Sequence, residues 1–262
     1  MPTANQIKEH WDNKASTFGT DSRATHEDVF LRQMEIENLA KYLENNKNIV
    51  DVGCGNGYST IELSKKYSEI NMVGLDYSEK MIEVANDALK KENTKNVRFQ
   101  VFDILDDTTD LSEQFDIAIS ERCLINLSSI EDQVKGLINI SNLVKPGGLI
   151  LLSEETIQAY NNINNLRKKV NLPDMAIQWH NLYLDIDIIL NKVSHVLEFV
   201  KEDNFSSSYY IGTRFYKALF YESIGKDPGS DLTSIFNQSA TLVPPLGDFG
   251  LLKIIVLKKV NK

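Results

Sequence analysis

The residues best suited to chemistry are an acidic residue and three glycines at alternate positions: Asp51, Gly53, Gly55 and Gly57, in the segment NIVDVGCGNGYS. Because glycine has no Cβ, such a loop lets the backbone approach a ligand where a side chain would collide. Asp76 ends the next apolar run, 19 residues after Gly57. A doubly wound sheet places a carboxylate against ribose hydroxyls at about this distance. The spacing predicts a nucleotide-type binding site.

The glycine spacing also separates two classes of ligand. Dinucleotide sites favour G-x-G-x-x-G, in which the last glycine lets the helix begin close under a pyrophosphate, whereas this loop reads G-x-G-x-G. A carboxylate at Asp51 would repel a pyrophosphate, but it suits a ligand that carries an ammonium and a sulfonium. The loop therefore disfavours a nicotinamide-dependent oxidoreductase and favours a positively charged sulfur compound.

Strands and helices alternate along the chain to position these residues. Strands are predicted near 48–52, 71–75, 97–102, 115–120 and 148–153, and helices near 58–67, 79–92, 130–144 and 159–170. This order predicts an α/β fold with a parallel sheet and helices on both faces. Two further helices are predicted before the sheet, at 6–18 and 25–45, and two closing strands after it, within 205–220 and 250–260.

Five segments, in order and at matching spacings, carry a resemblance to a known family. They are VDVGCGNGYST, GLDYSEKMIEVA, FQVFDILD, FDIAISE and LVKPGGLILLSEE, which together span about residues 48–155. In this combination the chain resembles class I S-adenosylmethionine-dependent methyltransferases. The resemblance implies a Rossmann-like, seven-stranded, mostly parallel sheet with one antiparallel strand.

The resemblance also implies roles for particular residues. The residue matching Asp51 and the glycines would face the methionine part of S-adenosylmethionine, and Asp76 would hold the ribose hydroxyls. Asp103 would meet the adenine amino group, with the alternative that it is a turn residue at a strand end. The remaining expected cofactor residues, in sequence order, are Tyr77, Met81 on the adenine, Ile104 and Ser120. No metal is expected.

A single methyltransferase domain of 262 residues is predicted, in four parts. Residues 1–47 form an amino-terminal helical cap, 48–153 the cofactor-binding core, 154–204 an insertion and helix that shape the acceptor pocket, and 205–262 the closing strands. In methyltransferases of this type the amino-terminal helices lie over the cofactor cleft. Trp11 is therefore expected either to line the site or to anchor helix packing.

The acceptor is expected to bind at the carboxyl ends of the strands, near the switch point of the sheet. Glu121, Arg122 and Asn126 follow the fourth strand and are predicted to line this cleft. The alternative for Glu121 and Arg122 is an ion pair at the surface.

Two later segments supply further acceptor candidates. The segment QWHNLYLD contains His180, the candidate general base, and Tyr183. A structural role for His180 is the alternative. In the segment YYIGTR, Tyr210 and Arg214 would share one face of a strand and Tyr209 would point to the other.

Composition excludes several classes of partner. The net charge is −9 and no basic stripe is present, whereas nucleic-acid enzymes need a basic face. No apolar run is long enough to span a bilayer, and the amino terminus lacks a secretory signal. Cys54 and Cys123 are too few for a disulfide framework or a metal cluster. A cytoplasmic enzyme with a small-molecule acceptor is predicted, and its oligomeric state is left open.

We therefore expect S-adenosylmethionine-dependent O-methylation of a small sugar- or phosphate-bearing metabolite. His180, Glu121 and Arg122 are the catalytic candidates, and a hydroxyl acceptor would need a base whereas a phosphate would need arginines. SERCLINL, WHNLYLD and YYIGTR resemble methyltransferases of small polar acceptors, some linked to surface polysaccharide. The alternatives are N-methylation of a small amine and a non-catalytic cofactor-binding protein. The expected acceptor-binding residues are Trp11, Asn126, Tyr183, Tyr210 and Arg214.

Overall fold

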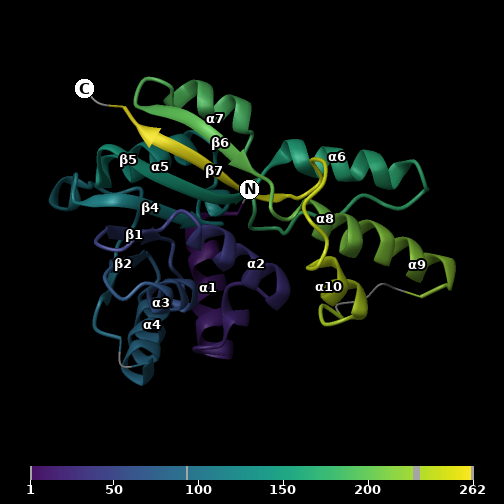
Figure 1. Cartoon of the computed structure of the whole chain (residues 1–262), viewed down its shortest axis with the longest axis horizontal. Helices are drawn as coiled ribbons and strands as arrows, with labels where there is room; N and C mark the ends of the chain where they lie inside the picture. Colours follow the sequence, from purple (N-terminus) through teal and green to yellow (C-terminus); the bar gives the residue numbers. More distant parts are fainter. Residues whose placement is uncertain (1, 93, 227–230, 261–262) are drawn as a thin grey trace.

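One seven-stranded sheet organises the molecule, with the strand order β3-β2-β1-β4-β5-β7-β6 (Figure 1). The computed structural model describes residues 2–92, 94–226 and 231–260. Strands β1 to β5 run parallel to one another, and β7 runs antiparallel to both β5 and β6. The predicted α/β, Rossmann-like fold is therefore confirmed. The strands are β1 Asn48–Val52, β2 Asn71–Asp76, β3 Val97–Val101, β4 Phe115–Glu121, β5 Val144–Glu155, β6 Leu197–Asp203 and β7 Leu252–Lys259.

Helices cover both faces of the sheet. The strand order turns at β1 and β4, so right-handed crossovers place α3 and α4 on one face and α5 on the other. Accordingly, α3 packs with α2 and α4, whereas α5 packs with α7. The α-helices are α1 Ala4–Phe18, α2 Val29–Ala40, α3 Tyr58–Lys66, α4 Glu79–Glu92, α5 Ile130–Leu143, α6 Ile157–Lys168, α7 Ile186–Val193, α8 Ser207–Tyr210, α9 Lys217–Ser223 and α10 Ile235–Ala240.

The two helices before the sheet begin at capping residues. A capping box formed by Thr3 and Gln6 starts α1. The predicted helix at 25–45 is shorter than expected, because Asp28 caps α2 by accepting a hydrogen bond from the Leu31 amide. A short 3₁₀ helix, η1 (Ser22–Ala24), lies between α1 and α2.

One predicted closing strand is wrong. Residues 205–220 are helical: α8, the π-helical turn η4 (Ile211–Tyr216) and α9 follow one another. The strand beside β7 is β6, which lies in the segment assigned to the acceptor-pocket insertion. Tyr, Ile, Thr and Phe in 205–220 have high β-propensity, which is easily overridden by packing, whereas β6 has the polar sequence LEFVKED on the sheet edge. The other closing strand, β7, is confirmed.

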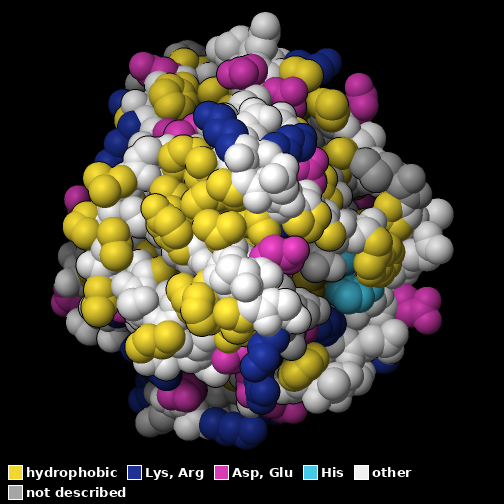
Figure 2. Space-filling model, turned by 90° about the vertical axis from the view of Figure 1, so that its right-hand side faces the viewer, with side chains coloured by type: hydrophobic (Ala, Val, Ile, Leu, Met, Phe, Trp, Pro, Cys, Tyr) yellow, Lys and Arg dark blue, Asp and Glu magenta, His cyan; other side chains and the backbone are white. Residues whose placement is uncertain are grey.

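One side of the molecule exposes a group of hydrophobic side chains (Figure 2). Figure 2 shows hydrophobic side chains gathered on the side where Figure 1 places α6, α9 and α10. Tyr216 at the end of η4, Phe220 in α9 and Ile224 just after α9 are exposed at spacings of four residues. The main core, by contrast, lies between the central strands and the helices on either face.

Candidate active site

The glycine loop joins β1 to α3 in a conformation that requires glycine. Gly53, Gly55 and Gly57 have φ values of 76°, 53° and 75°, in the left-handed region that other residues rarely adopt. A Cβ on Gly57 would also lie 2.5 Å from the Phe99 ring, and one on Gly55 would lie 2.5 Å from Thr25 Cγ2. The Phe99 ring and the Thr25 methyl group therefore pack closely against this loop at the carboxyl end of the sheet.

Asp51 is a buried carboxyl group with one unused oxygen. The Thr60 hydroxyl donates a hydrogen bond to Asp51 Oδ2, while Oδ1 is buried without a partner. Burial raises the pKa of Asp51 to about 6. A buried acceptor without a donor is costly, so this atom suits an ammonium brought by a ligand.

Asp76 ends β2 and faces the same loop. Its Oδ2 accepts a hydrogen bond of 2.9 Å from the Gly55 amide, and its Oδ1 accepts one of 2.9 Å from the Ser78 amide. Burial raises the pKa of Asp76 to about 6. The neighbouring Tyr77 hydroxyl is buried without a partner. This end of the site therefore offers a carboxylate and an unused hydroxyl to a ligand.

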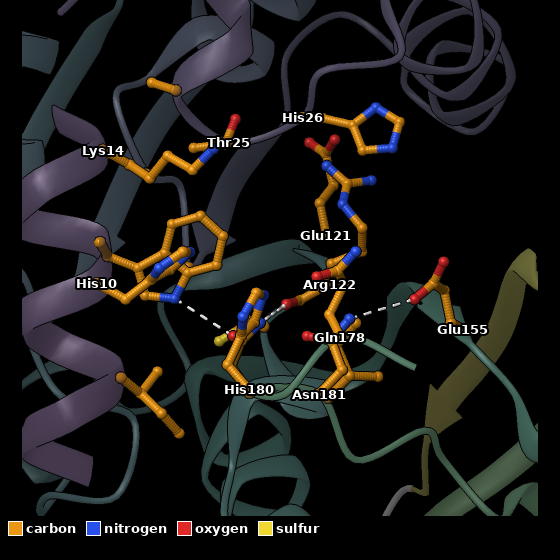
Figure 3. Close-up of a pocket in the computed structure, with 18 of the residues that line it drawn as sticks. His10, Lys14, Thr25, His26, Glu121, Arg122, Glu155, Gln178, His180 and Asn181 are labelled. Carbon is orange, nitrogen blue, oxygen red and sulfur yellow. Dashed lines mark hydrogen bonds between the residues drawn. The ribbon is translucent and has the colours of Figure 1, made fainter. Parts of the chain in front are cut away.

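A cavity of about 530 Å³ runs along the carboxyl ends of the strands beneath α1 and η1 (Figure 3). This volume lies in the range of small-molecule sites. Fifteen of the eighteen predicted site residues line the cavity; Asp51, Gly57 and Ser120 do not. The lining members are Trp11, Gly53, Gly55, Asp76, Tyr77, Met81, Asp103, Ile104, Glu121, Arg122, Asn126, His180, Tyr183, Tyr210 and Arg214.

Asp103 and Ser120 have structural contacts of their own. Asp103 Oδ1 accepts a hydrogen bond from the Leu105 amide, so Asp103 is a turn residue and also lines the cavity. The Ser120 hydroxyl donates to Glu154 Oε1 at 3.1 Å. Glu154 also accepts hydrogen bonds from the amides of Cys123 and Leu124. Sequence reasoning missed this buried carboxylate, which holds the loop after β4 in place.

Two buried ion pairs connect α2 to the last residue of β4 and the residue that follows it. Arg32 Nη1 lies 3.3 Å from Glu121 Oε2, and Arg122 pairs with Glu35. Burial raises the pKa of Glu121. The alternative of a surface pair between Glu121 and Arg122 is therefore wrong, because each has its partner on α2. Arg122 has φ = 54°, which costs an ordinary residue about 1–3 kcal/mol.

His180 belongs to an aromatic group at one end of the cavity. Its ring stacks on His10 of α1 at a centroid distance of 4.6 Å, and Trp11 and Trp179 lie edge-on to it. Burial and the proximity of His10 and Lys14 lower the pKa of His180 to about 4. The imidazole is thus neutral at pH 7, with Nδ1 buried and unpartnered.

Trp11 and Arg214 each line the cavity and also make a contact that packs the protein. Trp11 Nε1 donates to Asn126 Oδ1 at 3.2 Å, so Trp11 both anchors α1 and lines the cavity. Arg214 pairs with Asp28 at 3.1 Å and lies over the Tyr210 ring. Tyr210 and Arg214 share a face as predicted, but through helical spacing of four residues and not through strand alternation.

Sequence reasoning missed the charged residues of α2 and its cap. Asp28, Arg32 and Glu35 are buried at spacings of four and three residues. Charged residues on the buried face of an amphipathic helix are unusual, and this pattern was the available signal. This pattern indicates that α2 makes a buried polar contact, but it does not identify the residues that α2 contacts.

The comparisons with known proteins agree with this geometry. A family model described as a methyltransferase domain matches residues 43–199, more than half of the chain. The chain belongs to this family and is a class I S-adenosylmethionine-dependent methyltransferase.

Individual relatives match only in part. EEF1A lysine methyltransferase 2 of Danio rerio is 29% identical over 128 residues, covering 47% of this chain and 52% of that protein. Malonyl-[acyl-carrier protein] O-methyltransferase of Bacillus anthracis is 31% identical over 113 residues, covering 42% and 39%. The chain thus spans about half or less of the length of these relatives.

The N-methyltransferase NodS of Bradyrhizobium japonicum, solved with S-adenosylhomocysteine, shares the fold. Its TM-score is 0.57 at 12% identity, covering 98% of this chain and 99% of that chain.

The residues present fit S-adenosylmethionine as the cofactor. The unpartnered Asp51 Oδ1, the glycine loop and the Asp76 carboxyl group at its edge are suited to an ammonium, a sulfonium and ribose hydroxyls. Within residues 2–92, 94–226 and 231–260 no cluster of metal-ligating side chains is found. None of the described helices has the length and apolar character needed to cross a bilayer.

Proposed function

We propose that this methyltransferase methylates a hydroxyl oxygen of a small polar acceptor, with His180 as the general base. The observation that carries this proposal is the state of His180: a neutral imidazole that lines the cavity, with a buried and unpartnered Nδ1. A base with a free nitrogen can take the proton that a hydroxyl must lose, a contribution of about 10²–10⁴ in rate.

The residues of the chain have three tasks in this reaction. S-adenosylmethionine supplies a methyl group on a positively charged sulfur. Asp76 and the glycine loop orient the cofactor, with the unpartnered oxygen of the buried Asp51 beside the loop, and Asn126 and Tyr183 line the acceptor half of the cavity. Trp11 and α1 cover the cavity and exclude water. In-line methyl transfer depends mainly on such positioning.

The state of the arginines favours an uncharged hydroxyl over a phosphate. Arg32, Arg122 and Arg214 each pair with a buried or half-buried carboxylate. A phosphate would compete with these carboxylates for the same guanidinium groups, and leaving a carboxylate buried and unpaired is costly. A sugar or related polyol is therefore the better acceptor candidate, and surface polysaccharide intermediates are one source to test.

The experiment uses labelled S-adenosylmethionine, the purified protein and a metabolite extract. We expect a labelled product in which mass spectrometry and NMR identify the transferred methyl group as an O-methyl ether. His180→Ala should lower kcat by about 10²–10⁴ while leaving the Kd of S-adenosylhomocysteine unchanged. An unchanged kcat in this variant would remove His180 from the mechanism.

Methylation of an amine nitrogen is the second candidate. It is supported by the similarity to EEF1A lysine methyltransferase 2 and by the neutral state of His180, which could equally deprotonate an ammonium. The position of the label in the product separates the two. A protein that binds S-adenosylmethionine but yields no labelled product from any extract would instead fit a non-catalytic role.

A further inference from the structure

Glu155 is a carboxylate of the cavity that has only neutral partners. It is the last residue of β5, at the carboxyl end of the sheet. Tyr210 Oη donates to Glu155 Oε1 at 3.3 Å. Asn181 Nδ2 donates to Glu155 Oε2 at 3.5 Å (Figure 3). The Tyr183 hydroxyl also interacts with this carboxylate. No ion pair of Glu155 occurs within the described part of the chain.

Glu155 lacks a cation of its own. Burial raises the pKa of Glu155, and the guanidinium groups of Arg122 and Arg214 oppose this rise. Each is already paired, Arg122 with Glu35 and Arg214 with Asp28. Both guanidinium groups therefore already have a carboxylate partner, and Glu155 is left without a paired cation in the acceptor half of the cavity. Buried charges are normally paired, so this part of the site lacks a positive charge.

A second unused acceptor lies beside Glu155. The side-chain oxygen Oδ1 of Asn181 is buried without a hydrogen-bond partner, while its Nδ2 donates to Glu155. The rings of Tyr183 and Tyr210 complete this part of the lining. Two acceptors and two aromatic rings suit a group that is rich in donors and positively charged.

We propose that Glu155, with Asn181 Oδ1 and the two tyrosine rings, binds a positively charged amino group of the acceptor. This names amine-bearing compounds, such as amino sugars and amino alcohols, as the acceptor class. It rests on the proposed function, because it assigns the acceptor half of the cavity. The methyl group would go to a hydroxyl of that compound, or to the amine itself once the bound ammonium has given a proton to a base such as His180.

The first test measures the charge balance on the protein loaded with S-adenosylhomocysteine. Glu155→Gln should keep or raise Tm at pH 7.5, because it removes a charge without leaving an arginine unpaired. The matched control, Asp28→Asn, should lower Tm because it leaves Arg214 buried without its partner. Equal losses of Tm in the two variants would show that Glu155 neutralises Arg122 or Arg214, and would overturn the proposal.

Methylammonium chloride serves as the probe for the site itself. At equal ionic strength it should raise Tm of the wild-type protein above the value in sodium chloride, since a ligand that binds only the folded state stabilises it. This difference should be absent in Glu155→Gln. A difference of the same size in both proteins would place the binding elsewhere and contradict the proposal.

The second test asks whether the natural acceptor is an amine. A metabolite extract is incubated with labelled S-adenosylmethionine before and after acylation of its amines with an N-hydroxysuccinimide ester. Acylation should abolish the labelled product, and Glu155→Gln should raise the acceptor KM at least tenfold. A product that survives acylation, with an unchanged KM, contradicts the proposal. If the untreated extract gives no product, the proposed function fails. The methylammonium measurement then still tests whether Glu155 binds a cation.

Discussion

Asp51 and Asp76 are buried carboxyl groups whose ionised form a positively charged ligand would stabilise. In the cofactor-free protein, burial raises the pKa of each to about 6, from an ordinary value of 3.8. Between pH 4 and pH 6 the folded protein therefore holds protons that the unfolded chain has lost. Each group lowers the free energy of unfolding as the pH rises through this window. Binding of a cation would reverse this loss.

Replacing Asp51 by Asn should expose this effect. Near pH 4 both side chains are neutral, so the variant and the wild type should have similar Tm values. As the pH rises through 6, the Tm of Asp51→Asn should exceed that of the wild type, since only the wild type must ionise a buried carboxyl group. Thermal unfolding across pH 4–8, without cofactor, measures the difference.

The same variant should bind the cofactor poorly. Isothermal titration calorimetry with S-adenosylhomocysteine should show a loss of at least tenfold in affinity, because the ammonium loses its carboxylate partner. A variant that is less stable than the wild type at every pH, or that binds with unchanged affinity, would contradict this role of Asp51.

His180 predicts a particular pH dependence of catalysis. Its pKa of about 4 means that the base form predominates above pH 5. With S-adenosylmethionine saturating, so that Asp51 and Asp76 are already ionised, kcat/KM for the acceptor should stay flat from pH 6 to 8 and fall only near pH 4. An unperturbed histidine would give a fall near 6.5. The His10→Phe variant is a suitable control, since it keeps an aromatic ring against His180 without a titrating group. An acidic limb near pH 6.5 would mean that a different or less buried base operates.

The helix α2 shows what a whole element contributes. Arg32 and Glu35 lie three residues apart and reach the consecutive residues Glu121 and Arg122. Consecutive residues of a regular strand point to opposite faces. The left-handed conformation of Arg122 lies at the end of β4, where this alternation stops, and both side chains meet one helix. The two ion pairs fasten α2 over the carboxyl end of the sheet.

Breaking one of these pairs should be costly. Glu35→Gln should lower the free energy of unfolding by about 3–5 kcal/mol, because Arg122 is left buried without its partner. Adding Arg122→Met should recover a large part of this loss. Chemical denaturation of the two single variants and the double variant gives the coupling. The exposed pair of Lys90 and Asp87 is the control, where Lys90→Met should change stability by less than about 1 kcal/mol. Additive losses at Glu35 and Arg122 would contradict the pairing.

The sequence predicted the elements with local signals and missed those set by tertiary contacts. The glycine loop, β2 with Asp76 and the alternation of strands and helices in the core follow from short motifs and periodicity. Residues 205–220 are helical although their composition favours a strand. There the Tyr209 hydroxyl contacts Asp28 at 2.6 Å and Asn237 at 2.8 Å. These partners lie far away in the sequence, so no local pattern contains them. The pairing of α2 with β4 was invisible for the same reason.

At the scale of the whole molecule, the amino-terminal segment joins the two halves of the cavity. Asp12 of α1 accepts a hydrogen bond from the Ser78 hydroxyl beside Asp76, and Trp11 contacts Asn126 in the acceptor half. The glycine loop is tied to the same segment, because Asn56 Nδ2 donates to the carbonyl oxygens of Gly19 and Asp21. A ligand in the cavity lies beneath this segment.

Cofactor binding should therefore slow the opening of α1. Hydrogen exchange of α1 and η1 should slow by about a hundredfold at a concentration of S-adenosylhomocysteine 100 times its Kd, if opening releases the ligand. The edge strand β6 is the control and should change little. Mass spectrometry of peptides from these segments measures both. Equal protection of α1 and β6 would indicate general stabilisation and not a cover over the cavity.

The aromatic group around His180 has a practical consequence. The chain contains two tryptophans, and both Trp11 and Trp179 lie against the His10 and His180 rings. All of the intrinsic indole fluorescence thus originates at one end of the cavity. The emission spectrum of the unlabelled protein should change when an acceptor enters the cavity. Candidate compounds can therefore be screened by tryptophan fluorescence before any product is detected.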